Sequence, residues 1–150
     1  MREIDPRSFQ LGMINCFAEM VAAGVKKLAI SPPLSPEEYQ EIKEASEAIV
    51  AGSGIHSRLE TSLLITDLQS PEFTRGKWSV LYYKASETLD AYEALKDRKT
   101  KLEAVGAYDA DARREVSAEF MRLLSYPQET IDAKLESGGE EDPYILLGDD

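Results

Sequence analysis

Residues 78–83 have the sequence WSVLYY, and the conformation of this stretch decides the fold class. The stretch is short and rich in β-branched and aromatic residues, which is typical of a buried strand. Ser86 and Glu87 just beyond it are typical of a new helix start and therefore favour a strand that ends before them. The alternative is one long helix over residues 76–105. On that helix the following apolar residues would share one seam: Trp78, Leu81, Ala85, Tyr92, Leu95 and Leu102.

Two further stretches predict partner strands for residues 78–83. Residues 62–68 (SLLITDL) would pair with them as a hairpin whose long loop contains Pro71 and Gly76. Residues 25–30 form a short apolar run before SPP at 31–33, which indicates a third, buried strand followed by a break. The sequence therefore predicts a sheet of about three strands.

Helix signals flank these strands on both sides. Asp5 and Pro6 predict an N-cap and first turn for a helix over 6–23, and Gly24 ends it. Ser35 and Glu38 form a capping box that starts a second helix. Later helices are predicted over 87–105, from Asp109 or Asp111 to the Tyr126-Pro127 break, and over 127–136.

These elements predict a helix-rich α+β fold, with a small sheet of about three strands packed against five to six helices. An all-α fold is the alternative if residues 77–84 are helical. We expect one globular domain over 1–139 and a C-terminal tail over 140–150 that docks on its own or a neighbouring subunit. The tail residues expected to make this contact are Tyr144, Ile145, Leu146 and Leu147.

Composition limits the classes of partner and the compartment. The chain has 150 residues and a net charge of −11, and such a charge argues against nucleic-acid binding because its long-range field repels phosphates. The lone cysteine, Cys16, excludes an internal disulfide, and its mid-helix position predicts a small core residue. No apolar run is long enough to cross a membrane. A cytoplasmic location is therefore expected.

Paired carboxylates are the candidate metal ligands. Glu41 and Glu44, and likewise Glu87 and Asp90, lie about one helical turn apart, a spacing at which two carboxylates can share Mg²⁺. This spacing resembles the acidic helix pairs of all-α nucleoside triphosphate pyrophosphohydrolases. The resemblance implies a Mg²⁺-dependent phosphohydrolase. Of the functions that we consider for this sequence, it is the only one that requires a cofactor. The sequence departs from that pattern because predicted strands separate the two pairs.

Basic residues give a candidate anion site. The cluster consists of Lys96, Lys99 and Lys101 with Arg114. It would bind phosphate or serve a nucleic-acid accessory protein, although interleaved carboxylates weaken its field.

Residues 120–129 (FMRLLSYPQE) resemble an LLGYP-type segment that occurs in some prokaryotic proteins, which suggests a small domain of prokaryotic type. Ser125 stands where that segment has glycine, which could change the turn. The resemblance carries over no activity and no site residue.

The sequence leaves the ligand and the biological process open. It contains no strong metal, nucleophile or phosphate-loop motif, so we expect a non-catalytic protein-interaction or ligand-sensing domain rather than an enzyme. The surplus of apolar residues in the tail and beside the sheet predicts self-association, with a homodimer as the simplest form.

Overall fold

The computed structural model describes residues 3–68 and 71–137 and confirms the helix-rich α+β fold. Residues 79–83 form a strand, so the all-α alternative is wrong. Contacts along the chain define two compact units. The sheet unit comprises Met1–Leu63 and Gly76–Ala85, and the helical unit comprises Leu64–Arg75 and Ser86–Asp150. The prediction of one domain over 1–139 stays a prediction.

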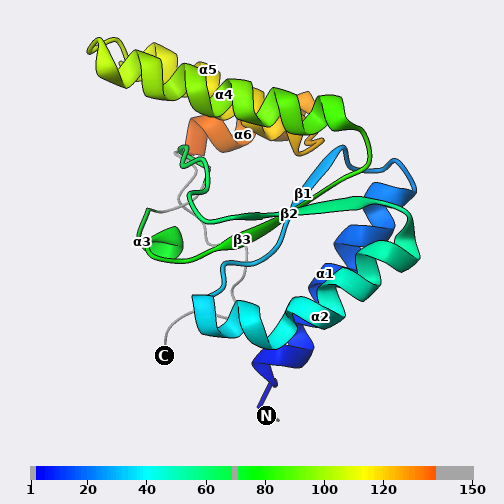
Figure 1. Cartoon of the computed structure of the whole chain (residues 1–150). Helices are drawn as coiled ribbons and strands as arrows, with labels where there is room; N and C mark the ends of the chain where they lie inside the picture. The colour runs from blue at the N-terminus through cyan, green and yellow to red at the C-terminus, as the bar shows by residue number, and fades with distance from the viewer. Residues whose placement is uncertain (1–2, 69–70, 138–150) are drawn as a thin grey trace. The chain divides into compact units, whose positions relative to one another are not determined.

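The sheet unit contains three antiparallel strands and two helices. Its elements in chain order are α1 (Pro6–Ala22), β1 (Leu28–Ile30), α2 (Pro36–Ser53), β2 (His56–Glu60) and β3 (Ser79–Tyr83). The strand order is β1-β3-β2, so the last strand lies between the other two. Figure 1 shows α1 and α2 packed side by side against this sheet.

One hydrophobic core joins both helices to one face of the sheet. It takes Ile14, Ala18 and Val21 from α1, and Val80 and Tyr82 from β3. Strand alternation places Val80 and Tyr82 on the same face, which is why both reach the helices. The Tyr82 hydroxyl lies 3.3 Å from the Ser46 hydroxyl of α2, so this buried polar group is hydrogen-bonded.

The predicted strand over 62–68 is wrong. The second strand is β2, which ends at Glu60 and pairs in antiparallel register with β3, placing Leu59 opposite Val80. This edge strand escaped recognition because its sequence, HSRLE, contains one large apolar residue. His56 is the first residue of β2, and its ring lies against the Tyr83 ring with 5.7 Å between ring centroids.

The inward face of α1 also differs from the expectation. Cys16 is exposed rather than buried in the core. Phe9, Met13 and Met20 recur at helical spacing on α1, but they are only half-buried. The apolar arc of this helix is therefore wider than the face that the core covers. We call Phe9, Met13, Cys16 and Met20 the outer flank of α1.

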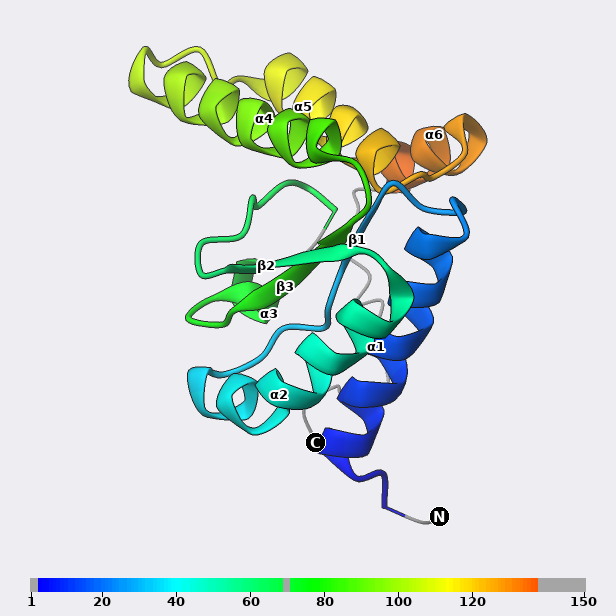
Figure 2. The same ribbon diagram turned by 45° about the vertical axis from the view of Figure 1, so that its right-hand side comes forward.

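The helical unit is built from α4 (Ser86–Ala104), α5 (Ala110–Leu123) and α6 (Gln128–Ser137), with the single turn α3 (Pro71–Thr74). α5 packs against both other long helices, and α4 and α5 run side by side in Figure 1 and Figure 2. Tyr92 and Phe120 meet in this interface with ring centroids 6.3 Å apart. The three helices therefore form a small layer centred on α5.

Residues 64–68 belong to the helical unit as an irregular segment that ends in a turn. Its backbone bonds to helix side chains instead of to a strand. Leu64 N–H donates to the Tyr92 hydroxyl at 3.0 Å, and Asp67 N–H donates to the Ser117 hydroxyl at 3.1 Å. Lys99 Nζ donates to the Ile65 carbonyl at 2.7 Å. These bonds explain why an apolar, strand-like sequence is not part of the sheet.

Candidate functional site

The four candidate metal ligands are exposed and belong to different units. Glu41 and Glu44 lie on α2 in the sheet unit, whereas Glu87 and Asp90 lie on α4 in the helical unit. Within residues 3–68 and 71–137, no group of three or more His, Cys, Asp or Glu side chains could hold a metal ion. The Mg²⁺-dependent reaction stays a prediction.

The predicted basic cluster is divided among separate partners. Lys101 pairs with Asp97 at 2.7 Å, and the hydrogen bond to this carboxylate raises the pKa of Lys101. Lys99 bonds to the Ile65 carbonyl, and Lys96 lies over the Tyr92 ring at 5.9 Å from its centroid. Three of the four predicted cations are therefore occupied by groups of the chain itself.

Arg114, the fourth predicted cation, is different. It lies exposed on α5, and within the described part of the chain its guanidinium forms no hydrogen bond or ion pair. Its neighbour Arg113 is paired with Asp67 at 2.7 Å, and that hydrogen bond raises the pKa of Arg113. Two adjacent arginines on one helix thus have opposite roles: Arg113 holds the 64–68 segment, and Arg114 is available.

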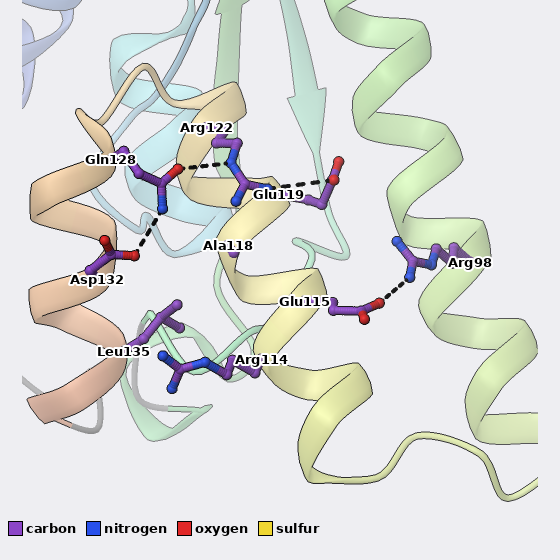
Figure 3. Close-up of a pocket in the computed structure, with 9 residues that line it drawn as sticks. All are labelled: Arg98, Arg114, Glu115, Ala118, Glu119, Arg122, Gln128, Asp132 and Leu135. Carbon is purple, nitrogen blue, oxygen red and sulfur yellow. Dashed lines mark hydrogen bonds and ion pairs between the residues drawn. The ribbon is translucent and has the colours of Figure 1, made fainter.

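A hollow of about 270 Å³ opens beside Arg114 between α5 and its neighbouring helices. The side chains around it are drawn in Figure 3: Arg98, Arg114, Glu115, Ala118, Glu119, Arg122, Gln128, Asp132 and Leu135. Arg98 is held by Glu115 at 2.7 Å. Arg114 extends from α5 toward Leu135 of α6, and no dashed line joins it to another residue in the view.

The remaining polar groups of this first hollow form one chain of contacts. Glu119 lies 3.6 Å from Arg122. Arg122 Nε donates to the Gln128 side-chain oxygen at 3.3 Å, and the Gln128 amide nitrogen donates to Asp132 at 2.9 Å. Among the arginines of the first hollow, Arg98 and Arg122 are paired with carboxylates, whereas Arg114 has no ion pair within the described residues.

A second hollow of about 270 Å³ shares Arg114 and Leu135 with the first. Its other lining residues are Asp67, Leu68, Ala110, Asp111, Met121 and Lys134. Lys134 lies over the Tyr126 ring at 5.5 Å from its centroid, and burial raises the pKa of Tyr126. In this second hollow Arg114 therefore lies among both charged and apolar side chains.

The chemistry available in these hollows is recognition by charge and shape. An arginine fork binds a carboxylate or phosphate through two parallel hydrogen bonds. Carboxylates, a lysine and apolar side chains surround Arg114 in the two hollows, so both charge and shape would select a ligand there.

Sequence reasoning identified Arg114 but missed the residues around it. Arg122 was absent from the predicted cluster, although positions 114, 118 and 122 on α5 follow the four-residue spacing of one helix face. Gln128 and Asp132 repeat that spacing on α6. This periodicity was the available signal. The predicted contact residues of the tail, Tyr144–Leu147, lie outside the described residues.

Among the helices that the structure describes, none combines the length and apolar character needed to span a bilayer. No family model matches this chain, and no characterised protein or solved structure matches it significantly. The function is therefore inferred from the site alone.

Proposed function

We propose that this chain is a non-catalytic interaction or ligand-sensing domain whose helical unit binds an anionic group at Arg114. One observation carries the proposal: Arg114 lines both hollows and is unpaired within the described residues, whereas Arg98, Arg113 and Arg122 around it are all paired. A carboxylate or phosphate would complete the pairing.

The net charge of −11 does not oppose such a contact at short range. At physiological ionic strength the field of distant carboxylates is screened over about 8 Å, so the local guanidinium dominates for a ligand already in the hollow. The same negative charge slows the approach of polyanions, which agrees with a small ligand or a short acidic segment rather than nucleic acid.

The test is a nuclear magnetic resonance titration of the full chain with citrate and, separately, with inorganic pyrophosphate. We expect saturable shifts of the backbone amides of α5 and α6 around the hollows. Arg114→Gln should abolish them, because the fork that holds the anion is lost. Arg7→Gln, which removes an exposed arginine of α1, is the charge-matched control and should titrate like the wild type.

The two probes distinguish a carboxylate site from a phosphate site. Shifts that persist in Arg114→Gln, or the absence of saturable shifts with both probes, would contradict the proposal.

Self-association and a cytoplasmic location belong to the same proposal. The support for self-association is apolar surface: Val25 of the sheet unit is 65% exposed and Val105 of the helical unit is 77% exposed. The two valines lie on different units, and each would lose its exposure to water if a second copy of the chain covered it. The one cysteine fits a reducing compartment, where disulfides have no stabilising role.

A further inference from the structure

Asp111 is a second charged residue of the second hollow that no ion pair neutralises. It is exposed in the first turn of α5, and within the described residues its carboxylate forms no hydrogen bond or ion pair. The other carboxylate of this hollow, Asp67, is neutralised by Arg113 at 2.7 Å. The hollow therefore contains a carboxylate and a guanidinium, those of Asp111 and Arg114, that each lack a counter-ion.

These two charges lie side by side without meeting. Asp111 and Arg114 are three positions apart on α5, a spacing at which the Cβ atoms are about 5–6 Å apart on one side of a helix. Arg114 extends toward Leu135 of α6 (Figure 3) and forms no ion pair with Asp111. Lys134, the other cation of this lining, lies over the Tyr126 ring. A small ligand beside α5 can therefore contact Asp111 and Arg114 together.

The rest of the lining is largely apolar. Leu68 and Met121 are almost covered by their own unit, whereas Ala110 and Leu135 are more exposed. An aliphatic group placed against them would lose contact with water, which is favourable. The volume of about 270 Å³ lies just below the range of about 300–1,000 Å³ typical of small-molecule pockets. The hollow therefore suits a compact ligand with one apolar part.

We infer that the second hollow binds a free amino acid with an aliphatic side chain, whose carboxylate pairs with Arg114 and whose ammonium pairs with Asp111. Two covalent bonds separate the amino nitrogen from the carboxylate carbon, so these atoms are about 2.5 Å apart. They can thus serve two side chains one helical turn apart, while the aliphatic part contacts Leu135. The inference rests on the proposed function, because it names a ligand for the same guanidinium.

A zwitterion fits this lining better than a simple anion does. An anion bound to Arg114 in the second hollow would also lie near the Asp111 carboxylate, and like charges repel. The ammonium of an amino acid converts that repulsion into a second contact. A ligand without net charge is also not repelled by the net charge of −11. Because both contacts are exposed to solvent, each should change the affinity only a few-fold.

The experiment titrates L-leucine and 4-methylpentanoate into the full-length protein and measures dissociation constants from the amide shifts of α5 and α6. 4-Methylpentanoate has the carboxylate and the carbon skeleton of leucine but no ammonium. We expect leucine to bind about twofold to fivefold more tightly, which is the contribution of one exposed ion pair. Arg114→Gln should weaken the binding of both ligands, because both use the carboxylate.

Asp111→Asn distinguishes a ligand contact from a structural role. It should weaken leucine about twofold to fivefold and leave 4-methylpentanoate unchanged or bound more tightly, so that the preference for leucine disappears. Glu129→Gln is the matched control, because Glu129 is exposed and is the second residue of α6, as Asp111 is of α5. This variant should keep the wild-type preference for leucine.

The outcomes separate the inference from the proposed function. Equal affinities for leucine and 4-methylpentanoate in the wild type, both reduced in Arg114→Gln, would overturn the role of Asp111 and leave an anion site at Arg114. A preference for leucine that persists in Asp111→Asn would overturn the ammonium contact. Binding of citrate without binding of leucine would overturn the amino acid as ligand. No saturable binding of leucine, 4-methylpentanoate, citrate or pyrophosphate would overturn the proposed function and the inference with it.

Discussion

Ser125 occupies a backbone position that glycine holds at the ends of α1, α2 and α4. α1, α2 and α4 each end in a Schellman motif with a glycine at positive φ: Gly24 at 80°, Gly54 at 69° and Gly106 at 70°. α5 ends with the same hydrogen bonds, since Ser125 N–H donates to the Arg122 carbonyl and Tyr126 N–H donates to the Met121 carbonyl. Ser125 adopts φ of 68° and is the one non-glycine residue with positive φ among those described.

The LLGYP-type resemblance had marked this position, where glycine is usual and serine stands here. The turn is not changed by the substitution. Instead the serine accepts the left-handed conformation, which costs a residue with a Cβ about 1–2 kcal/mol. Ser125 also makes a contact of its own, so a comparison with the wild type alone would mix two effects.

Two variants separate the backbone strain from the side-chain contact. Ser125→Gly and Ser125→Ala both remove the hydroxyl, and they differ in whether a Cβ must adopt positive φ. We expect the glycine variant to have the higher free energy of unfolding by about 1 kcal/mol in urea denaturation. The control is Ala133→Gly, at an exposed site within α6. Glycine at that helical position should lower the free energy of unfolding by about 1 kcal/mol. Equal stability of the two Ser125 variants would contradict the strain.

At the scale of elements, the sequence predicted helices better than strands. Caps are short-range signals: the Asp5 side chain accepts from Ser8 N–H at 2.9 Å, and the Ser35–Glu38 capping box is formed as expected. The helix 6–23 differs from α1 by one residue at its end. Such local patterns can be recognised without knowledge of the rest of the chain.

Strand pairing is a long-range property, and here the sequence misled. Residues 62–68 have the composition of a strand, yet their donors and acceptors are taken by side chains of α4 and α5 about 30 to 50 positions further along the chain. β2 is polar because it lies at the edge of the sheet, where pairing with β3 positions it without an apolar pattern.

The candidate site could be predicted only in part. The sequence identified Arg114 as a candidate cation. That Arg114 lacks a partner depends on which carboxylates and rings the fold places beside the other cations.

The hold of α5 on the 64–68 segment can be tested at Ser117. This residue is fully buried, and its hydroxyl accepts the Asp67 N–H. Ser117→Ala leaves that donor without its partner, which should cost about 1–3 kcal/mol. Hydrogen exchange should show a faster Asp67 amide, while amides of β3 keep their wild-type protection.

Thr100→Ala is the matched control, because Thr100 is exposed on α4 and its hydroxyl donates only to the Lys96 carbonyl of its own helix. Unchanged exchange at Asp67 in Ser117→Ala would mean that the hydrogen bond does not hold the segment.

For the whole molecule, the open question is association between copies. The core of the sheet unit covers one part of α1, with Ile14, Ala18 and Val21 buried, and leaves the outer flank half-buried or exposed. Burial of apolar area is worth roughly 25 cal/mol per Å², so a flank of this kind is stabilised when a second copy covers it. In a two-fold dimer the same flank would serve both partners.

Sedimentation velocity over a range of protein concentrations tests this arrangement. The chain has a mass of 16.7 kDa, and we expect the wild type to approach twice that mass as concentration rises. Met13→Glu places a charge in the outer flank and should shift the population to monomer, because the dimer would have to bury that charge. Asn15→Glu adds the same charge at an exposed position on α1 and should leave the dimer intact. Circular dichroism would establish that both variants are folded.

A wild type that stays at 16.7 kDa at every concentration would show the self-association prediction to be wrong. A dimer that survives Met13→Glu would exclude the outer flank as the interface and direct the search to the exposed Val105 at the end of α4.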